Sequence, residues 1–121
     1  MATAGVQVSL FIDPEQSQLE AAVAIGAPVV EIHTGAYAEA KQEPARNIEL
    51  ARIQQAVEYG NNLGLQVNAG HGLDYHNIRA VADMTGIVEF NIGHAIIARA
   101  IFSGLFQAVA DMKALIQPTT R

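Results

Sequence analysis

A short run rich in β-forming residues is followed by a helical pattern four times in succession along this 121-residue chain. The β-rich runs cover residues 6–12, 28–33, 65–72 and 87–92. Each helical pattern places apolar residues three or four positions apart, and a glycine follows each of the first three patterns. Alternation of strand and helix is typical of parallel βα units. The sequence therefore predicts an α/β fold of four consecutive parallel βα units, in a single domain over residues 1–121.

Several residues predict where the helices begin and end. Asp13 and Pro14 suit the N-cap and first turn of the first helix. The loop after the second strand, through Pro44, is expected to be the longest loop, and the fourth helix is expected to be the longest helix. The apolar residues on one face of that helix are Ile97, Ile101, Leu105, Val109, Met112 and Ile116. Residues 117–121 are expected to form a frayed tail.

The polar residues of the four strands fall in one phase. Side chains point alternately to the two faces of a sheet. The face expected to pack under the helices carries Val8, Leu10, Ile12, Val30, Ile32, Leu65, Val67, Ala69, Val88, Phe90 and Ile92. The opposite face carries Ser9, Phe11, Glu31, His33, Gln66, Asn68, Glu89 and Asn91. Parallel strands are normally apolar on both faces, so this repeated polar set requires an explanation.

Three architectures explain the polar face. A two-layer sheet would leave it in water. A closed (β/α)8 barrel would enclose it as a polar cavity, once four further βα units were supplied. A half-barrel could instead cover it by pairing with a second copy of itself.

Composition excludes several classes of function. The absence of cysteine excludes disulfides, thiolate metal sites and cysteine nucleophiles. A net charge of −5, with 7 Lys and Arg and 6% aromatic residues, argues against a nucleic-acid-binding surface. No apolar run approaches the roughly 20 residues that cross a bilayer, and residues 1–5 do not resemble a secretion signal. A soluble, cytoplasmic protein without membrane contact is expected.

Three of the four histidines stand at predicted strand ends. His33 ends the second strand, His71 lies at the end of the third, and His94 follows the fourth. Parallel βα structures build their active sites at the carboxyl ends of the strands. Glycines on both sides of His71 would let the backbone approach a ligand closely, and imidazole is suited to proton transfer. His71 is therefore the main candidate for acid–base chemistry, against the alternative of a polar turn residue.

Glu31 shares its face of the sheet with His33. In a cavity, such a carboxylate could orient a substrate, stabilise a cation or exchange protons. The alternative is a carboxylate satisfied by hydrogen bonds or an ion pair inside the sheet.

Gly93 and His94 lie where the last strand meets the last helix. The free N–H groups and the dipole at a helix N-terminus favour an anion, and Gly72 could add an amide from the neighbouring loop. (β/α)8 barrels often hold phosphate in the loops after their last two strands. The alternative for each glycine is a plain tight turn, and neither a P-loop nor a dinucleotide-binding fingerprint occurs in the sequence.

A divalent metal is the rival use of the same side chains. Imidazole and carboxylate groups from His33, His71, His94 and Glu31 could converge on one ion. No close ligand pair such as HExxH supports this reading, so no metal site is predicted.

Four blocks of the chain resemble, in order, the pyridoxine 5′-phosphate synthase family, whose fold is a (β/α)8 barrel. They are VSLFID at 8–13, EIHTG at 31–35, VNAGHGL at 67–73 and NIGHAII at 91–97. Tyr37-Ala38 and Arg99-Ala100 extend the second and fourth blocks. Together the blocks span nearly the whole chain, which matches the C-terminal half of the family barrel, strands 5–8.

The resemblance implies a reaction in vitamin B6 synthesis. The family condenses 1-deoxy-D-xylulose 5-phosphate with 3-amino-2-oxopropyl phosphate to give pyridoxine 5′-phosphate, without a redox cofactor or metal. By motif, His71 matches the catalytic proton donor and Glu31 matches the carboxylate that stabilises the transition state. Gly72, Gly93 and His94 match residues that bind the aminoketone phosphate. A homo-oligomer is also expected from the family.

The chain departs from the family in length. Members are about twice as long, and their first four βα units carry a second catalytic histidine, a catalytic glutamate and the residues that hold the sugar phosphate. We therefore expect the isolated chain to lack synthase activity unless an N-terminal half is supplied. The alternative function is a non-catalytic half-barrel that binds phosphate or assembles with a partner.

Overall fold

Four parallel strands form one sheet in the order in which they occur along the chain. The computed structural model describes residues 2–117, so all but the first residue of the expected tail lies outside it. The strands are β1 (Ser9–Ile12), β2 (Val29–His33), β3 (Gln66–Gly70) and β4 (Ile87–Asn91). Each strand is followed by at least one helix, and neighbouring strands pair in parallel. The predicted run of four βα units, half of a (β/α)8 barrel, is confirmed.

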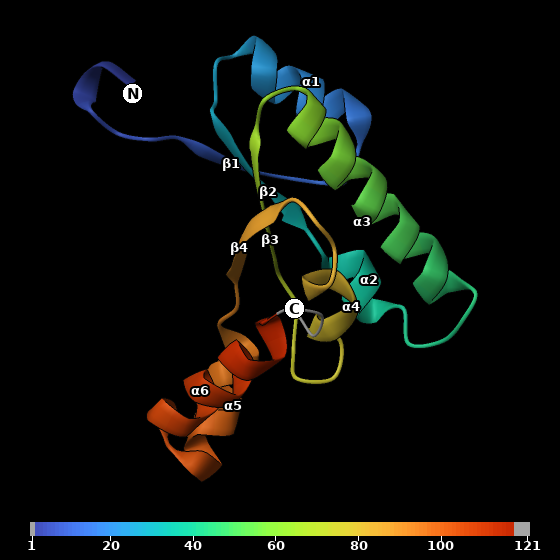
Figure 1. Cartoon of the computed structure of the whole chain (residues 1–121), viewed down its shortest axis with the longest axis vertical. Helices are drawn as coiled ribbons and strands as arrows, with labels where there is room; N and C mark the ends of the chain where they lie inside the picture. The colour runs from blue at the N-terminus through green and yellow to red at the C-terminus, as the bar shows by residue number, and fades with distance from the viewer. Residues whose placement is uncertain (1, 118–121) are drawn as a thin grey trace.

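The helices vary widely in length. Besides the short 3-10 turn η1 (Ala2–Ala4), they are α1 (Gln16–Ala24), α2 (Gly35–Glu39), α3 (Ala45–Asn62), α4 (Ile78–Ala82), α5 (His94–Ser103) and α6 (Leu105–Ile116). In Figure 1, α1 and α3 lie side by side over the sheet, whereas α5 and α6 extend away from it. Among the described residues, no helix is both long and apolar enough to cross a membrane.

The core lies between the sheet and the helices packed on one of its faces. Its fully buried apolar side chains include Leu19, Val30, Ile32, Tyr37, Ile53, Val57, Val67, Ile78, Val81 and Met112. The strand residues among them belong to the face that was predicted to pack under helices. Polar contacts add to the packing of α1 on α3, because the Tyr59 hydroxyl donates to the Glu20 carboxylate at 2.5 Å. This hydrogen bond lowers the pKa of Glu20 and raises the pKa of Tyr59.

A bulge changes the predicted phase at the start of β4. Val67 pairs with Ile87 and Ala69 pairs with Phe90, so two steps on β3 oppose three on β4. As a result Ile87 packs against the core, and Val88, predicted to face the helices, is 66% exposed. The prediction for Val88 is therefore wrong, while Phe90 returns to the helix side.

The predicted long C-terminal helix is wrong. Gly104 adopts φ +85° and ψ 155°, a backbone conformation that is open to glycine, and it separates α5 from α6. The two helices pack against each other as a hairpin instead of continuing one apolar face. The apolar spacing runs on across Gly104, which is why periodicity predicted one helix.

Two further boundaries differ from the prediction. The N-cap of α1 is Glu15 rather than Asp13, whose backbone N–H is instead bonded to the Gln18 side chain. The segment predicted as the longest loop contains the short helix α2, which begins one residue after Thr34. The remaining loop before α3 is consequently shorter than expected.

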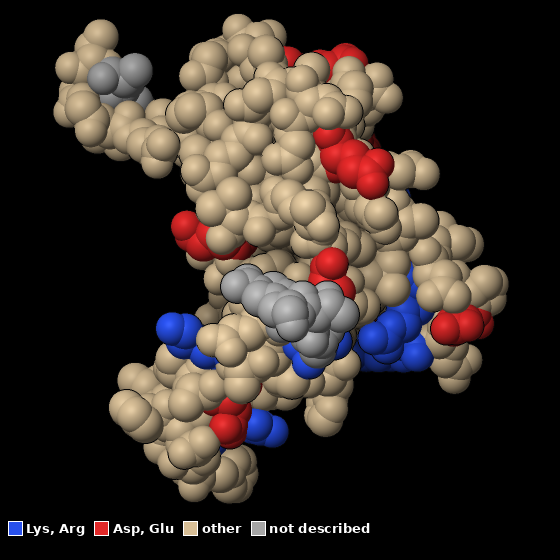
Figure 2. Space-filling model, in the orientation of Figure 1, with Lys and Arg blue, Asp and Glu red and all other residues tan. Residues whose placement is uncertain are grey.

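Large apolar side chains gather on the outside of the α5–α6 hairpin. We define this hairpin surface by Ile97, Ile101, Phe102, Leu105, Phe106 and Val109, all of which are well exposed. Phe102 is 93% exposed and Phe106 is 88% exposed. In the orientation of Figure 2 the hairpin is the lobe at the lower left, and most of its visible surface is uncharged. An exposed apolar area of this kind is typical of a contact surface.

Candidate functional site

The register of the sheet brings the carboxyl ends of β2, β3 and β4 level with one another. His33 pairs with Gly70, and Gly70 pairs with Asn91. A cavity of about 520 Å³ opens at these strand ends. Its lining residues are Phe11, Glu31, His71, Gly72, Leu73, Asp74, Asn91, Ile92, Gly93, His94, Ala95 and Ala98. The five residues singled out by sequence, Glu31, His71, Gly72, Gly93 and His94, therefore all line one cavity.

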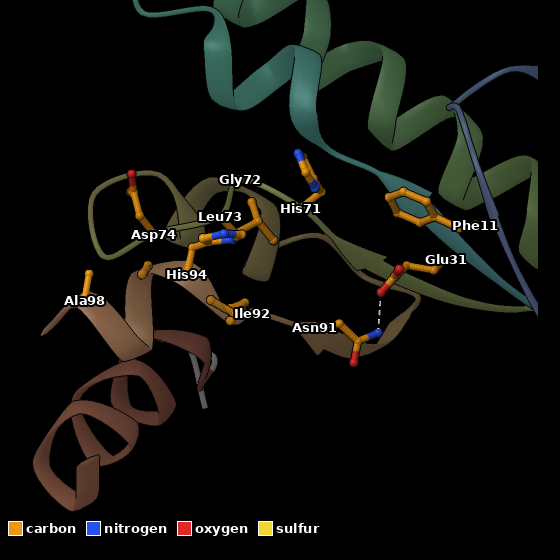
Figure 3. A pocket seen from close by; sticks show the side chains of 12 residues that line it. Phe11, Glu31, His71, Gly72, Leu73, Asp74, Asn91, Ile92, His94 and Ala98 are labelled. Atoms are coloured by element: carbon orange, nitrogen blue, oxygen red, sulfur yellow. Dashed lines mark hydrogen bonds between the residues drawn. The ribbon is translucent and has the colours of Figure 1, made fainter. Parts of the chain in front are cut away.

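Glu31 projects from the middle of β2 across the inner face of the sheet. The Asn91 side-chain amide donates a hydrogen bond to Glu31 Oε1, and Figure 3 shows the two groups pointing toward one another. Gly70 leaves the space in which the carboxylate lies, since a Cβ at this position would stand 2.7 Å from Glu31 Oε1 and 2.8 Å from the Asn91 carbonyl oxygen. The orientation of Glu31 is thus fixed by groups on β3 and β4.

His71 follows β3 in an unusual backbone conformation. Its φ is +87°, in the left-handed region that non-glycine residues seldom adopt and that often marks functional sites. Thr34, which is fully buried, holds the chain on both sides of this position. Its backbone N–H donates to the Gly70 carbonyl at 2.9 Å, and its hydroxyl lies 2.8 Å from that oxygen and 2.6 Å from the His71 carbonyl. The single hydroxyl proton is shared between the two carbonyls.

The loop after His71 is held by its own side chains. Asp74 Oδ1 accepts the backbone N–H groups of His76 and Asn77 at 2.8 and 2.9 Å. The buried Asn77 amide donates to the Gly72 carbonyl at 3.0 Å and accepts the Asp74 N–H at 2.7 Å. Asx turns of this kind fix a loop without regular secondary structure. Gly72 is therefore held in place beside the cavity.

Gly93 is the N-cap of α5, and His94 is its first residue. The first N–H groups of a helix have no carbonyl partner within the helix, and the dipole gives this end a partial positive charge. Both residues line the cavity together with Gly72, and no lysine or arginine among residues 2–117 lines it. An anion at this position would be bound by backbone N–H groups and imidazole rather than by a cationic side chain.

Two other residues at predicted strand ends lie outside the cavity. His33 does not line the cavity, and its Nδ1 accepts the Gly35 N–H at 2.9 Å. Asp13 does not line it either. Within residues 2–117, no group of three or more His, Asp or Glu side chains is arranged to hold a metal ion.

Sequence reasoning did not single out several residues that line the cavity. Phe11 and Asn91 were assigned to the inner face without a role, and strand phase was the signal that could have identified them. The others are Leu73, Asp74, Ile92, Ala95 and Ala98. These belong to the loops after β3 and β4 and the first turns of α5, where only the folded backbone shows which residues face inward.

Together these features define half of a (β/α)8 barrel with a polar site at the carboxyl ends of its strands. A family model described as pyridoxal phosphate biosynthesis protein PdxJ matches residues 1–118. The chain therefore belongs to the PdxJ family.

Two curated relatives carry the name pyridoxine 5′-phosphate synthase. The one from Idiomarina loihiensis is 55% identical over 116 residues, which cover 96% of this chain and 48% of the relative. The one from Blochmanniella pennsylvanica is 54% identical over 118 residues, which cover 98% of this chain and again 48% of the relative. The chain thus spans about half the length of these relatives, corresponding to their C-terminal half.

The Thr34 hydroxyl provides a test of how the His71 loop is held. Replacement by valine removes the donor and leaves the part-buried His71 carbonyl without this partner, so Thr34→Val should lower the free energy of unfolding by about 1–2 kcal/mol. Thr34→Ser keeps the hydroxyl and should cost less than about 1 kcal/mol, the value of one methyl group. Urea denaturation measures both. Equal losses in the two variants would mean that the hydroxyl contributes no more than the methyl group, which would contradict the assignment.

Proposed function

We propose that this chain provides the C-terminal half of the active site of a pyridoxine 5′-phosphate synthase. The reaction joins 1-deoxy-D-xylulose 5-phosphate to 3-amino-2-oxopropyl phosphate and releases inorganic phosphate and water. The observation that carries the proposal is the convergence of Glu31, His71, Gly72, Gly93 and His94 on one cavity at the strand ends. The identity of about 55% to relatives of that name supports it.

His71 is proposed as the proton donor. Imine formation, loss of phosphate, ring closure and dehydration all require protons at defined atoms, and an imidazole can supply them near neutral pH. The side chain is exposed to the cavity from a backbone held by Thr34. Such an arrangement presents the ring to a ligand without requiring movement of the loop.

Glu31 is proposed to stabilise positive charge. Protonated imines formed during the condensation are cations, and a fixed carboxylate lowers their energy where they develop. The hydrogen bond from Asn91 and the open space over Gly70 keep the carboxylate in one orientation. Preorganisation of this kind avoids the cost of reorienting a charged group during the reaction.

Gly72, Gly93 and His94 are proposed to bind the phosphate of the aminoketone. Backbone N–H groups at the start of α5 and at Gly72 supply donors, and the helix dipole favours the negative charge. The rest of the site, including the groups for the sugar phosphate, would come from four further βα units. Residues 1–121 would then form one folded unit equivalent to strands 5–8 of the complete barrel, acting in the cytoplasm.

A homo-oligomer is the proposed assembly. The hairpin surface exposes six large apolar side chains, and the same apolar surface on a second copy would be complementary to it. Burial of Phe102 and Phe106 would place aromatic anchors at the centre of such a contact.

Gly93 permits a direct test of phosphate binding. A Cβ added here would meet no atom within 4 Å, so a small side chain should leave the fold intact. Gly93→Asp adds a carboxylate beside the anion and should weaken binding of 3-amino-2-oxopropyl phosphate at least about tenfold, whereas the neutral Gly93→Asn should change it less than about threefold. Isothermal titration calorimetry measures the affinities. An unchanged affinity in Gly93→Asp would remove the phosphate assignment.

The synthase proposal is tested by supplying the missing half. We expect pyridoxine 5′-phosphate to form when the chain is combined with the N-terminal half of a relative, and not with the chain alone. His71→Asn keeps a residue that tolerates positive φ and should lower kcat by about 10²- to 10⁴-fold. The exposed His76, replaced by asparagine, is the matched control.

The outcomes of this experiment separate the alternatives. Turnover by the chain alone would contradict the need for a second half. An active combined enzyme that is unaffected by His71→Asn would contradict the assigned proton donor. Phosphate binding without turnover would favour the alternative function, a non-catalytic binding or assembly module.

The proposed assembly is tested at Phe102. Placing a charge in the hairpin surface with Phe102→Glu should raise the dissociation constant of the oligomer about tenfold or more, because an unpaired carboxylate would be buried. Ile25→Glu is the control, since Ile25 is 71% exposed on a different part of the molecule. Sedimentation velocity reports the change. Equal sedimentation of the two variants would exclude this surface from the contact.

A further inference from the structure

Three rings from successive strand ends lie against one another beside the cavity. Phe11 of β1 lies 4.7 Å from His33 of β2, measured between ring centroids, at an interplanar angle of 36°. His33 in turn lies 4.5 Å from His71, at an angle of 34°. Phe11 and His71 are farther apart, with centroids 6.4 Å from each other. His33 is therefore the ring that lies nearest to both of the others.

The His33 ring is fixed by the backbone of α2. Gly35 N–H donates to His33 Nδ1 at 2.9 Å, so this nitrogen carries a lone pair and the proton of the neutral ring is on Nε2. Gly35 also leaves room for the stack. A Cβ at this position would stand 2.9 Å from His33 Nδ1 and 3.2 Å from His71 Cδ2. Any larger residue at Gly35 would displace both imidazoles.

His71, by contrast, has little else to orient its ring. Among the hydrogen bonds of residues 2–117, its ring nitrogens have no protein partner. Its backbone is held by Thr34, but torsions about the side chain still allow several rotamers. The contact with His33 is the interaction that favours one of them.

We propose that His33 is a positioning residue that holds the His71 ring in its working orientation through the tilted contact between the two rings. This inference rests on the proposed function of His71 as proton donor. Proton transfer depends strongly on geometry, and a displacement of about 1 Å can cost about a hundredfold in rate. His33 would act without touching the substrate.

Two substitutions separate the ring of His33 from its hydrogen bond. His33→Phe keeps a flat ring against His71 but loses the acceptor for the Gly35 N–H. His33→Asn keeps an oxygen near the position of Nδ1 but loses the ring. The same substitutions at the exposed His76, whose side chain makes no hydrogen bond among residues 2–117, are the matched controls.

The first measurement is kinetic, on the chain combined with an N-terminal half of the barrel. His33→Asn should lower kcat about tenfold or more. It should change KM for the aminoketone phosphate less than about threefold, because His33 is not among the residues proposed to bind phosphate. His33→Phe should keep kcat within about threefold of the wild type. If kcat fell more in His33→Phe than in His33→Asn, the role of His33 would be to anchor Gly35. If kcat fell equally far in both variants, His33 would act as an acid or base itself. Either result, or full activity in both variants, would overturn the proposal.

The second measurement does not depend on activity. In nuclear magnetic resonance spectra of the full 121-residue chain, ring currents from His33 should shift the His71 ring protons upfield. His33→Phe should preserve this shift and His33→Asn should abolish it. Failure of the wild-type combined enzyme to turn over would count against the synthase proposal alone. Unchanged His71 resonances in His33→Asn would overturn the positioning role.

Discussion

Level pairing of the strands at their carboxyl ends is the interaction on which the site depends. The hydrogen bonds that join β2 to β3 and β3 to β4 place His33, Gly70 and Asn91 side by side. Because successive side chains alternate between faces, a slip of one residue would turn Glu31 from the inner face to the core. The buried Val30 and Ile32 on the opposite face prevent such a slip, since it would expose them to water. The apolar core therefore also sets the position of the polar site.

Glycine residues leave the space in which the side chains of the site lie. At Gly35, Gly70 and Gly72 an added Cβ would meet an imidazole, a carboxylate or the methyl group of Ala38. Groups from different strands can consequently approach to hydrogen-bonding or packing distance across these positions. The polar residues supply the chemistry, and the glycines determine how closely they meet.

Much of this arrangement follows from periodicity and strand phase. Alternating strands and helices predicted the fold, and the polar phase predicted that Glu31 lies on the inner face. The position of His71, Gly72, Gly93 and His94 after strand ends predicted that they would meet. Their catalytic and binding roles stay predictions.

The features that the sequence pattern did not predict depend on the backbone conformation of single residues. At Gly104 the apolar spacing continues through a turn, so a pattern of residue types does not reveal the break. The extra residue in β4 shifts Val88 by one position, and an alternating pattern of residue types does not reveal this shift. The left-handed φ of His71 and its contact with His33 depend on tertiary contacts of the loop, and residue type alone does not specify them.

Helix α5 begins at the cavity, yet none of its ten residues is buried in this chain. A helix of this length, whose apolar contact with the core is limited to partly buried residues such as Ile96, is only marginally stable by itself and relies on its contact with α6. If an anion binds at its first turn, part of the binding free energy becomes free energy of helix formation. Ligand affinity and local order of α5 would then be thermodynamically linked, so that each strengthens the other.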